Sequence, residues 1–292
     1  MHWLTLTLIC AFALASADAL TKRSLSGRDV RELTLVRFTV PGVLLLPWLL
    51  AQPLPALPLA FWLWMVVLLP AEIVAMLLYQ RAIRDHPLAL TLPYLAFTPV
   101  LVALIGWLVL GETVSPTGLA GILLIVFGGW LLNIHRTTAN GFWRQAVAPL
   151  AAIWENHGSR QMLGVATIYA FTAVGGKRAM AHATPETFGA LYFALLGLLT
   201  LILFGATRPA RLRVAREKPL AVIGVGVLMA VMVVTHFMAI SKVEAAYMIA
   251  VKRTSLLFGI LYGALLFREA HLGRNLVAGA LMIAGVGLIA VG

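Results

Sequence analysis

Long apolar runs separated by short polar gaps constrain the fold of this chain more than any other feature. A helix needs about 20 apolar residues to cross the hydrocarbon layer of a bilayer. We place ten such spans, and only the connections at 135–160 and 207–219 are of any length. The sequence therefore predicts an all-α polytopic membrane protein with ten transmembrane helices. The predicted spans are 3–20, 33–51, 59–79, 88–110, 116–134, 161–178, 186–206, 220–240, 245–267 and 273–291.

The composition argues against a soluble protein. Charged residues make up 11% of the chain and apolar residues 61%, whereas about a quarter of the residues in a soluble domain are charged. The net charge of +11 does not indicate nucleic-acid binding, because nearly all Lys and Arg lie between apolar runs, as in loops that face an anionic membrane surface. We expect a multi-pass protein of the cytoplasmic (inner) membrane, either a monomer or a homodimer. Its surroundings are the lipid bilayer, and we expect it to bind a small-molecule substrate but no nucleic acid.

The two halves of the chain resemble each other in near-constant register. Five helices in each half is an odd number, so the second copy must enter the membrane from the opposite face. Inverted repeats of this kind place a substrate site at their interface and give alternating access by rocking. We predict a first repeat at 1–134, a connecting loop at 135–160 and a second repeat at 161–292. The matching pairs, at shifts of 155 or 157 residues, are Phe38 with Phe193, Gly42 with Gly197, Gly106 with Gly263, and Glu112 with Glu269.

Lys252 and Arg253 lie near the middle of the ninth predicted span. A charge at the centre of a membrane helix costs about 2.5–3.5 kcal/mol, so it needs a reason. Adjacent helical residues differ by about 100° of rotation, so both side chains can reach one cavity. An ammonium beside a guanidinium fork suits a carboxylate or a phosphate. We favour an anion clamp on the substrate; the alternative is an internal ion pair with Glu72 or Asp18.

Glu72, in the middle of the third predicted span, has two possible roles. A carboxyl group in a low-dielectric cavity can exchange a proton during transport, or it can act as a fixed counter-ion to Lys252 or Arg253. His236 is a second candidate for proton coupling, because histidine titrates near physiological pH; a packing role is the alternative. Asp18 is expected to pair with Lys22, one helical turn later.

Hydroxyl-bearing side chains are the remaining candidates for substrate contact. We assign Tyr94 and Tyr247 to the cavity, because they lie in the fourth and ninth spans, and add Tyr79 and Ser255 to the predicted site.

Four further residues are predicted to be structural. A proline interrupts the fourth span, and a glutamate lies in the short connection after each of the fourth and ninth spans. An arginine near the start of the second span is shallow enough to snorkel to the headgroups. The glycines of the ninth span should loosen that helix as well. The four residues are Pro99, Glu112, Glu269 and Arg37.

Three stretches carry a resemblance to a known family. They are Arg37-Phe38, the segment from Tyr79 through Pro99 to Leu110-Gly111-Glu112, and the segment from Tyr247 through Lys252-Arg253-Thr254-Ser255 to Phe267-Arg268-Glu269. With its Gly-rich last span, the whole chain resembles the EamA-like branch of the drug/metabolite transporter superfamily. The resemblance implies secondary transport of small metabolites and leaves the substrate open. The Lys-Arg pair is also similar to one that contacts phosphate in triose-phosphate translocators.

These observations predict a secondary transporter of a small polar metabolite that bears a carboxylate or phosphate. The alternatives are a proton-coupled exporter of cationic drugs, with Glu72 as cation receptor, and a flippase for an anionic lipid. We expect no enzyme activity, because the sequence shows no cluster of acid/base or nucleophilic groups at one interface. We expect no cofactor and no metal, because the chain shows neither a Walker-type loop, which would bind ATP, nor metal-ligand spacing on one helix.

The distribution of basic residues predicts the orientation. Sixteen lie in loops after odd-numbered spans and three in the opposite loops. Because cytoplasmic loops are enriched in Lys and Arg, this places both termini outside the cytoplasm, whereas the family resemblance implies that both are inside.

Overall fold

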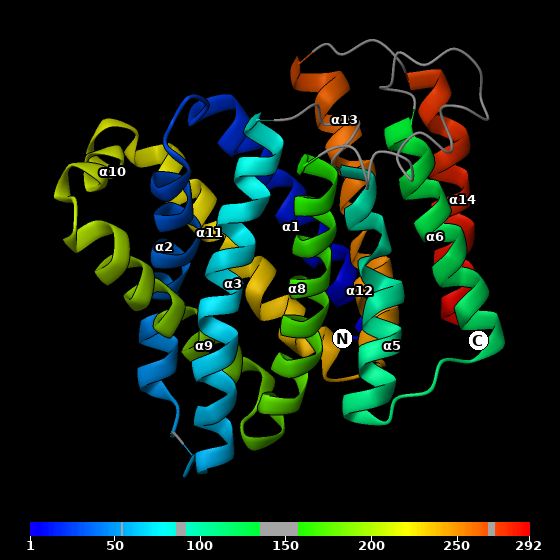
Figure 1. The fold of residues 1–292 in the computed structure, drawn as a ribbon, viewed down its shortest axis with the longest axis horizontal. Helices are drawn as coiled ribbons and strands as arrows, with labels where there is room; N and C mark the ends of the chain where they lie inside the picture. Colours follow the sequence, from blue (N-terminus) through cyan, green and yellow to red (C-terminus); the bar gives the residue numbers. More distant parts are fainter. Residues whose placement is uncertain (54, 86–91, 135–156, 268–271) are drawn as a thin grey trace.

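The structure, a computed structural model, describes residues 1–53, 55–85, 92–134, 157–267 and 272–292. The elements in these ranges are helices (Figure 1), so the predicted all-α fold is confirmed for the described residues. The elements are α1 (Trp3–Ser24), α2 (Val30–Ala51), α3 (Leu59–Asp85), η1 (Leu92–Phe97), α5 (Thr98–Leu110), α6 (Pro116–Ile134), α8 (His157–Ala179), η2 (Met180–His182), α9 (Pro185–Thr200), η3 (Leu201–Ala206), η4 (Pro209–Leu212), α10 (Arg213–Glu217), α11 (Pro219–Ile240), α12 (Ala245–Lys252), α13 (Ser255–Phe267) and α14 (Leu272–Val291).

Within the described residues, six helices are long and apolar enough to cross a membrane: α1, α2, α3, α9 with η3, α11, and α12 with α13. Three shorter apolar helices lie at 94–110, 116–131 and 277–291. The protein is therefore a multi-pass membrane protein. The predicted span at 161–178 forms helix α8, which falls outside both groups, so the number of ten spans stays a prediction.

Close helix contacts organise the bundle. Helix α2 packs along α9, α6 along α14, α1 along α11, and α3 along α8. At the first of these contacts, a Cβ atom added to Gly42 would lie 2.5 Å from the carbonyl oxygen of Phe193, and one added to Gly197 would lie 2.9 Å from that of Phe38. Glycine therefore lets the two backbones touch, as is common where membrane helices associate.

Three of the predicted spans change their helical geometry part way along. The seventh passes from α9 to η3, a π-helix, at Leu201. The fourth passes from η1 to α5 at Thr98, beside Pro99, and the Thr98 hydroxyl donates to the Leu95 carbonyl at 2.7 Å. The ninth is interrupted after Lys252, and α13 begins at Ser255. The predicted loosening at the glycines of the ninth span is wrong, because α13 runs through both of them as an unbroken helix.

The polar corners and the termini lie at defined ends of the bundle. Helix α5 ends at Gly111, whose φ of 70° is the left-handed conformation that glycine adopts without strain. Both termini lie in the lower half of Figure 1, while the basic segments 22–31 and 208–218 lie in the upper half. The face that carries the termini is called the termini face below, and the opposite one the basic face.

The Gly42 contact gives a direct test of this packing. Gly42→Ala should reduce the free energy of unfolding by about 1–3 kcal/mol, because the added methyl group meets backbone atoms that cannot turn aside. The measurement is the apparent unfolding temperature in detergent. Gly164→Ala, on α8 with nothing within 4 Å of the added Cβ, is the matched control and should keep or raise that temperature. Equal temperatures for Gly42→Ala and wild type would contradict the α2–α9 contact.

Candidate functional site

Polar side chains from four elements gather around the interruption between α12 and α13. We call this group the central polar cluster. Helix α3 contributes an acid and a tyrosine, α8 a tyrosine and a threonine, α11 a histidine, and the end of α12 two basic residues. The members are Glu72, Tyr79, Tyr169, Thr172, His236, Lys252 and Arg253.

Lys252 and His236, predicted separately from the sequence, are in contact. The Lys252 Nζ lies 3.3 Å from His236 Nδ1 and 3.7 Å from the sulfur of Met232. When the ammonium donates to Nδ1, that nitrogen must carry a lone pair, so the imidazole in this arrangement is the neutral form. The structure therefore places Lys252, which is predicted to bind the anion, in contact with His236, which is predicted to couple protons.

Arg253 lies in the interruption itself, between the two helices. Its Nε and the neighbouring Thr254 hydroxyl are buried without a hydrogen-bond partner among the described residues. The guanidinium interacts electrostatically with the phenols of Tyr79 and Tyr169. Buried polar groups are nearly always hydrogen-bonded, so two adjacent unsatisfied groups make this helix interruption the candidate binding site.

Glu72 lies near these basic groups without forming an ion pair with them. Its carboxylate forms a side-chain hydrogen bond with Thr172 and interacts electrostatically with Lys252. Within the described residues, no carboxylate lies within 4.0 Å of Lys252 or Arg253. The internal ion pair considered as the alternative to an anion clamp is thus not formed in this conformation.

The other two charges predicted inside spans pair with each other. Arg37 of α2 is buried and donates to the Asp18 carboxylate of α1. Two expectations are therefore wrong: Asp18 pairs with Arg37 rather than with Lys22, and Arg37 does not snorkel to the membrane surface. The reason is tertiary, because packing of α2 against the bundle buries Arg37 and a buried guanidinium needs a carboxylate.

The remaining predicted site residues are not members of the cluster. Tyr94 is fully buried with Ala82 and Met162 in a small core, against which Tyr79 and Tyr169 of the cluster pack, and it hydrogen-bonds to Ser159. Ser255 begins α13, next to the interruption. Tyr247 lies at the start of α12, toward the termini face. The structure thus brings together Tyr79, Lys252, Arg253, Glu72 and His236. It places Tyr94 in the small core against which Tyr79 packs, and Tyr247 apart from the cluster.

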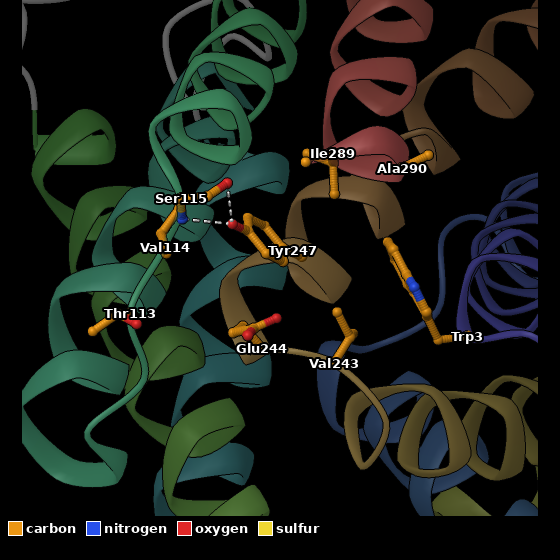
Figure 2. A pocket seen from close by; sticks show the side chains of 10 residues that line it. Trp3, Thr113, Val114, Ser115, Val243, Glu244, Tyr247, Ile289 and Ala290 are labelled. Atoms are coloured by element: carbon orange, nitrogen blue, oxygen red, sulfur yellow. Dashed lines mark hydrogen bonds between the residues drawn. The ribbon is translucent and has the colours of Figure 1, made fainter.

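Tyr247 instead joins α12 to the connection between α5 and α6. Its hydroxyl accepts from the Ser115 backbone N–H at 2.8 Å and lies 3.1 Å from the Ser115 hydroxyl, as Figure 2 shows. It also lines a pocket of about 410 Å³ on the termini face. The lining residues are Trp3, Thr113, Val114, Ser115, Val243, Glu244, Tyr247, Ile289, Ala290 and Gly292.

Glu112 does more than end a helix. One carboxylate oxygen lies 2.5 Å from Lys177 Nζ, and the other accepts from the Ala245 backbone N–H at 2.8 Å. Lys177 also donates to the Val243 carbonyl at 2.5 Å. Its counterpart in the predicted repeat, Glu269, lies outside the described residues.

Sequence reasoning missed Thr172 and Thr254 as members or neighbours of the cluster. A threonine in an apolar run is common and often bonds to its own helix backbone, so no local signal singled them out. The available signal was position: Thr254 directly follows the basic pair.

Comparison with known proteins agrees with this fold. The model of the EamA-like transporter family matches residues 1–134 and again 158–291. A solved structure titled "Crystal structure of protein" is similar with a TM-score of 0.74 and 21% identity, over 98% of this chain and 96% of that chain. At this identity the likeness supports the fold alone. A search of curated proteins found no match.

The Arg37–Asp18 pair predicts a specific loss of stability. Asp18→Asn leaves the buried Arg37 guanidinium without a charged partner and should reduce the free energy of unfolding by about 1–3 kcal/mol. The apparent unfolding temperature in detergent measures this. Asp29→Asn is the matched control: Asp29 lies 3.6 Å from the buried Arg211, which also donates to the Phe204 carbonyl and so keeps a partner. Equal losses in the two variants would contradict the special role of Asp18.

Proposed function

Because the chain belongs to the EamA-like transporter family, we propose that it is a secondary transporter of a small polar metabolite bearing a carboxylate or phosphate, in the cytoplasmic membrane. Family membership and the multi-pass fold make it a membrane transporter. The anionic substrate is inferred from the central polar cluster.

The observation that carries the anionic substrate is the unsatisfied state of the helix interruption. Arg253 Nε and the Thr254 hydroxyl are buried and unpartnered among the described residues, and the two residues directly follow Lys252 in the chain. A carboxylate or phosphate supplies several acceptor oxygens at once, which is what a guanidinium, a hydroxyl and an ammonium in series require. Interrupted helices at the midplane are where such transporters bind substrate.

The balance of charge points to the same substrate class. The cluster and the adjoining Arg37–Asp18 pair hold three basic side chains against two acidic ones. With His236 neutral, one positive charge is left uncompensated in a low-dielectric environment. An anion would remove that charge, whereas a cation would add to it.

Glu72 and His236 are the residues through which proton movement can be coupled to transport. Glu72 interacts electrostatically with Lys252, and His236 contacts the same ammonium. A substrate anion that draws Lys252 toward itself would change the charge seen by both groups at once. Lys252 would then link substrate binding to proton exchange.

Alternating access is proposed to arise from two inverted five-helix repeats. The family model matches once in each half. The packing has the same symmetry: exchanging the halves turns the α1–α11 contact into the α8–α3 contact, and leaves α2–α9 and α6–α14 unchanged. The η1–α5 and α12–α13 interruptions, at Thr98 and Ser255, are separated by the same 157 residues as the sequence repeat.

Export of cationic drugs is the second candidate, because Glu72 has no ion-pair partner within the described residues and is free to receive a cation. A flippase for an anionic lipid would use the same basic pair as the main proposal. The experiment below separates the three.

A thermal-shift panel on the detergent-purified protein tests the substrate class. The ligands are phosphorylated metabolites, carboxylates, amino acids, short-chain anionic lipids and cationic drugs. One soluble anionic class should raise the unfolding temperature of wild type, because a ligand at 100 times its Kd adds about 2.7 kcal/mol of stability. The shift should disappear in Lys252→Ala plus Arg253→Ala.

The matched control is Arg178→Ala, which removes an exposed arginine of α8 and should keep the shift. A shift caused by cations and lost in Glu72→Gln would instead establish the drug exporter. A shift caused by the anionic lipids alone would establish the flippase.

The orientation is a separate prediction. With the basic face in the cytoplasm, both termini lie outside it. A C-terminal alkaline phosphatase fusion should therefore be active and a C-terminal green fluorescent protein fusion dark. The reverse pair of results would place both termini in the cytoplasm, as the family resemblance implies.

A further inference from the structure

On the termini face, the Glu112–Lys177 ion pair ties together three segments that are distant in the sequence. Glu112 belongs to the corner after α5, and Lys177 to the end of α8. The second oxygen of Glu112 accepts from the first N–H of α12, and Lys177 donates to Val243 in the corner before α12. The pair therefore joins the half of the chain matched first by the family model to the half matched second.

Polar contacts cross this seam beside apolar packing. Beside the ion pair, the pocket of about 410 Å³ is lined by residues of both halves. The first half contributes Trp3, Thr113, Val114 and Ser115, and the second contributes Val243, Glu244, Tyr247, Ile289, Ala290 and Gly292. The Tyr247–Ser115 hydrogen bonds cross the same seam (Figure 2). The ion pair itself is reached by solvent, with 18% of the Lys177 side chain and 16% of the Glu112 side chain exposed. The polar contacts of the seam are therefore within reach of water, which can take their place when they break.

These contacts hold α12, the helix that carries Lys252, which is predicted to bind the substrate. Helix α12 is only eight residues long; Tyr247 lies in its first turn and Lys252 is its last residue. A movement of α12 away from the α5–α6 connection would therefore open a path from the termini face toward Lys252.

We propose that the Glu112–Lys177 pair is a lock that holds the termini face closed in this conformation and breaks when the protein opens toward that face. The proposal rests on the alternating access proposed above. It does not depend on the substrate, and its test uses none.

Cys10 provides a native probe for this opening. It is the single cysteine of the chain, it lies buried on α1, and it interacts electrostatically with Lys252, so it reports on the depth that an open path must reach. The rate at which a membrane-impermeant methanethiosulfonate reagent labels Cys10 is measured in membrane vesicles of both orientations. A C-terminal tag identifies the termini face.

Glu112→Gln and Lys177→Met should each increase labelling from the termini face by about tenfold or more, because labelling of a thiol follows its access to the reagent. Labelling from the basic face should stay at the wild-type rate. The variant that carries both substitutions should label no faster than either single variant, because each of the three variants lacks the same Glu112–Lys177 ion pair.

The control is Glu217→Gln, which breaks an ion pair of similar length, the 2.6 Å Arg28–Glu217 contact on the basic face, and should leave the rate unchanged. Two results would overturn the lock. One is a wild-type rate in both single variants. The other is an equal acceleration from both faces, which would mean general loosening of the bundle. If the anion panel fails while these labelling results hold, the lock stands and the substrate assignment falls.

Discussion

In the hydrocarbon core of a bilayer, every backbone N–H and C=O must find a partner within the protein. This constraint explains why the described elements are helices and why their interruptions are few and placed inside the bundle. The fourth span changes geometry beside Pro99, where the Thr98 hydroxyl takes up the Leu95 carbonyl. The ninth span is interrupted at Arg253, where the backbone N–H groups of Arg253 and Thr254 still reach carbonyls three residues back. The side chains are different: Arg253 Nε and the Thr254 hydroxyl have no hydrogen-bond partner among the described residues. This interruption, with its buried side chains left without partners, is the place to which we assign the substrate.

The charges inside the bundle show the same contrast between satisfied and unsatisfied groups. Arg37 meets Asp18 and Lys177 meets Glu112, so each of these cations is matched by a carboxylate from a distant element. Lys252 contacts His236 and a methionine sulfur, and Arg253 interacts with tyrosines. Within the described residues, no carboxylate forms an ion pair with Lys252 or Arg253, and this arrangement suits the binding of negative charge from outside. The paired cations hold helices together, and the unpaired ones are available to a ligand.

Much of the fold was predictable because apolar runs of membrane length have few alternative structures. The predicted span at 116–134 is α6 to the residue, and the spans at 245–267 and 273–291 differ from the helices by little. The helix end at Gly111 was predictable from its chemistry. The partner of Asp18 was not, because the i,i+4 rule considers one helix alone, whereas a second helix supplied the stronger partner. The prediction that the glycines loosen the ninth span was wrong for a related reason. Glycine permits a break in a helix but does not by itself cause one, and α13 is continuous through both glycines.

The sequence by itself determined the class of protein, the positions of the helices, the family and the basic pair, because these depend on local hydropathy and on residues adjacent in the chain. The tertiary structure alone decided which side chains meet. Lys252 reaches His236 and not Glu72, Tyr247 binds Ser115 at a seam rather than lining the cluster, and Glu112 joins two halves of the chain. These contacts span from 16 to more than 130 residues. They depend on how closely glycine-rich faces let helices approach, which no single helix encodes.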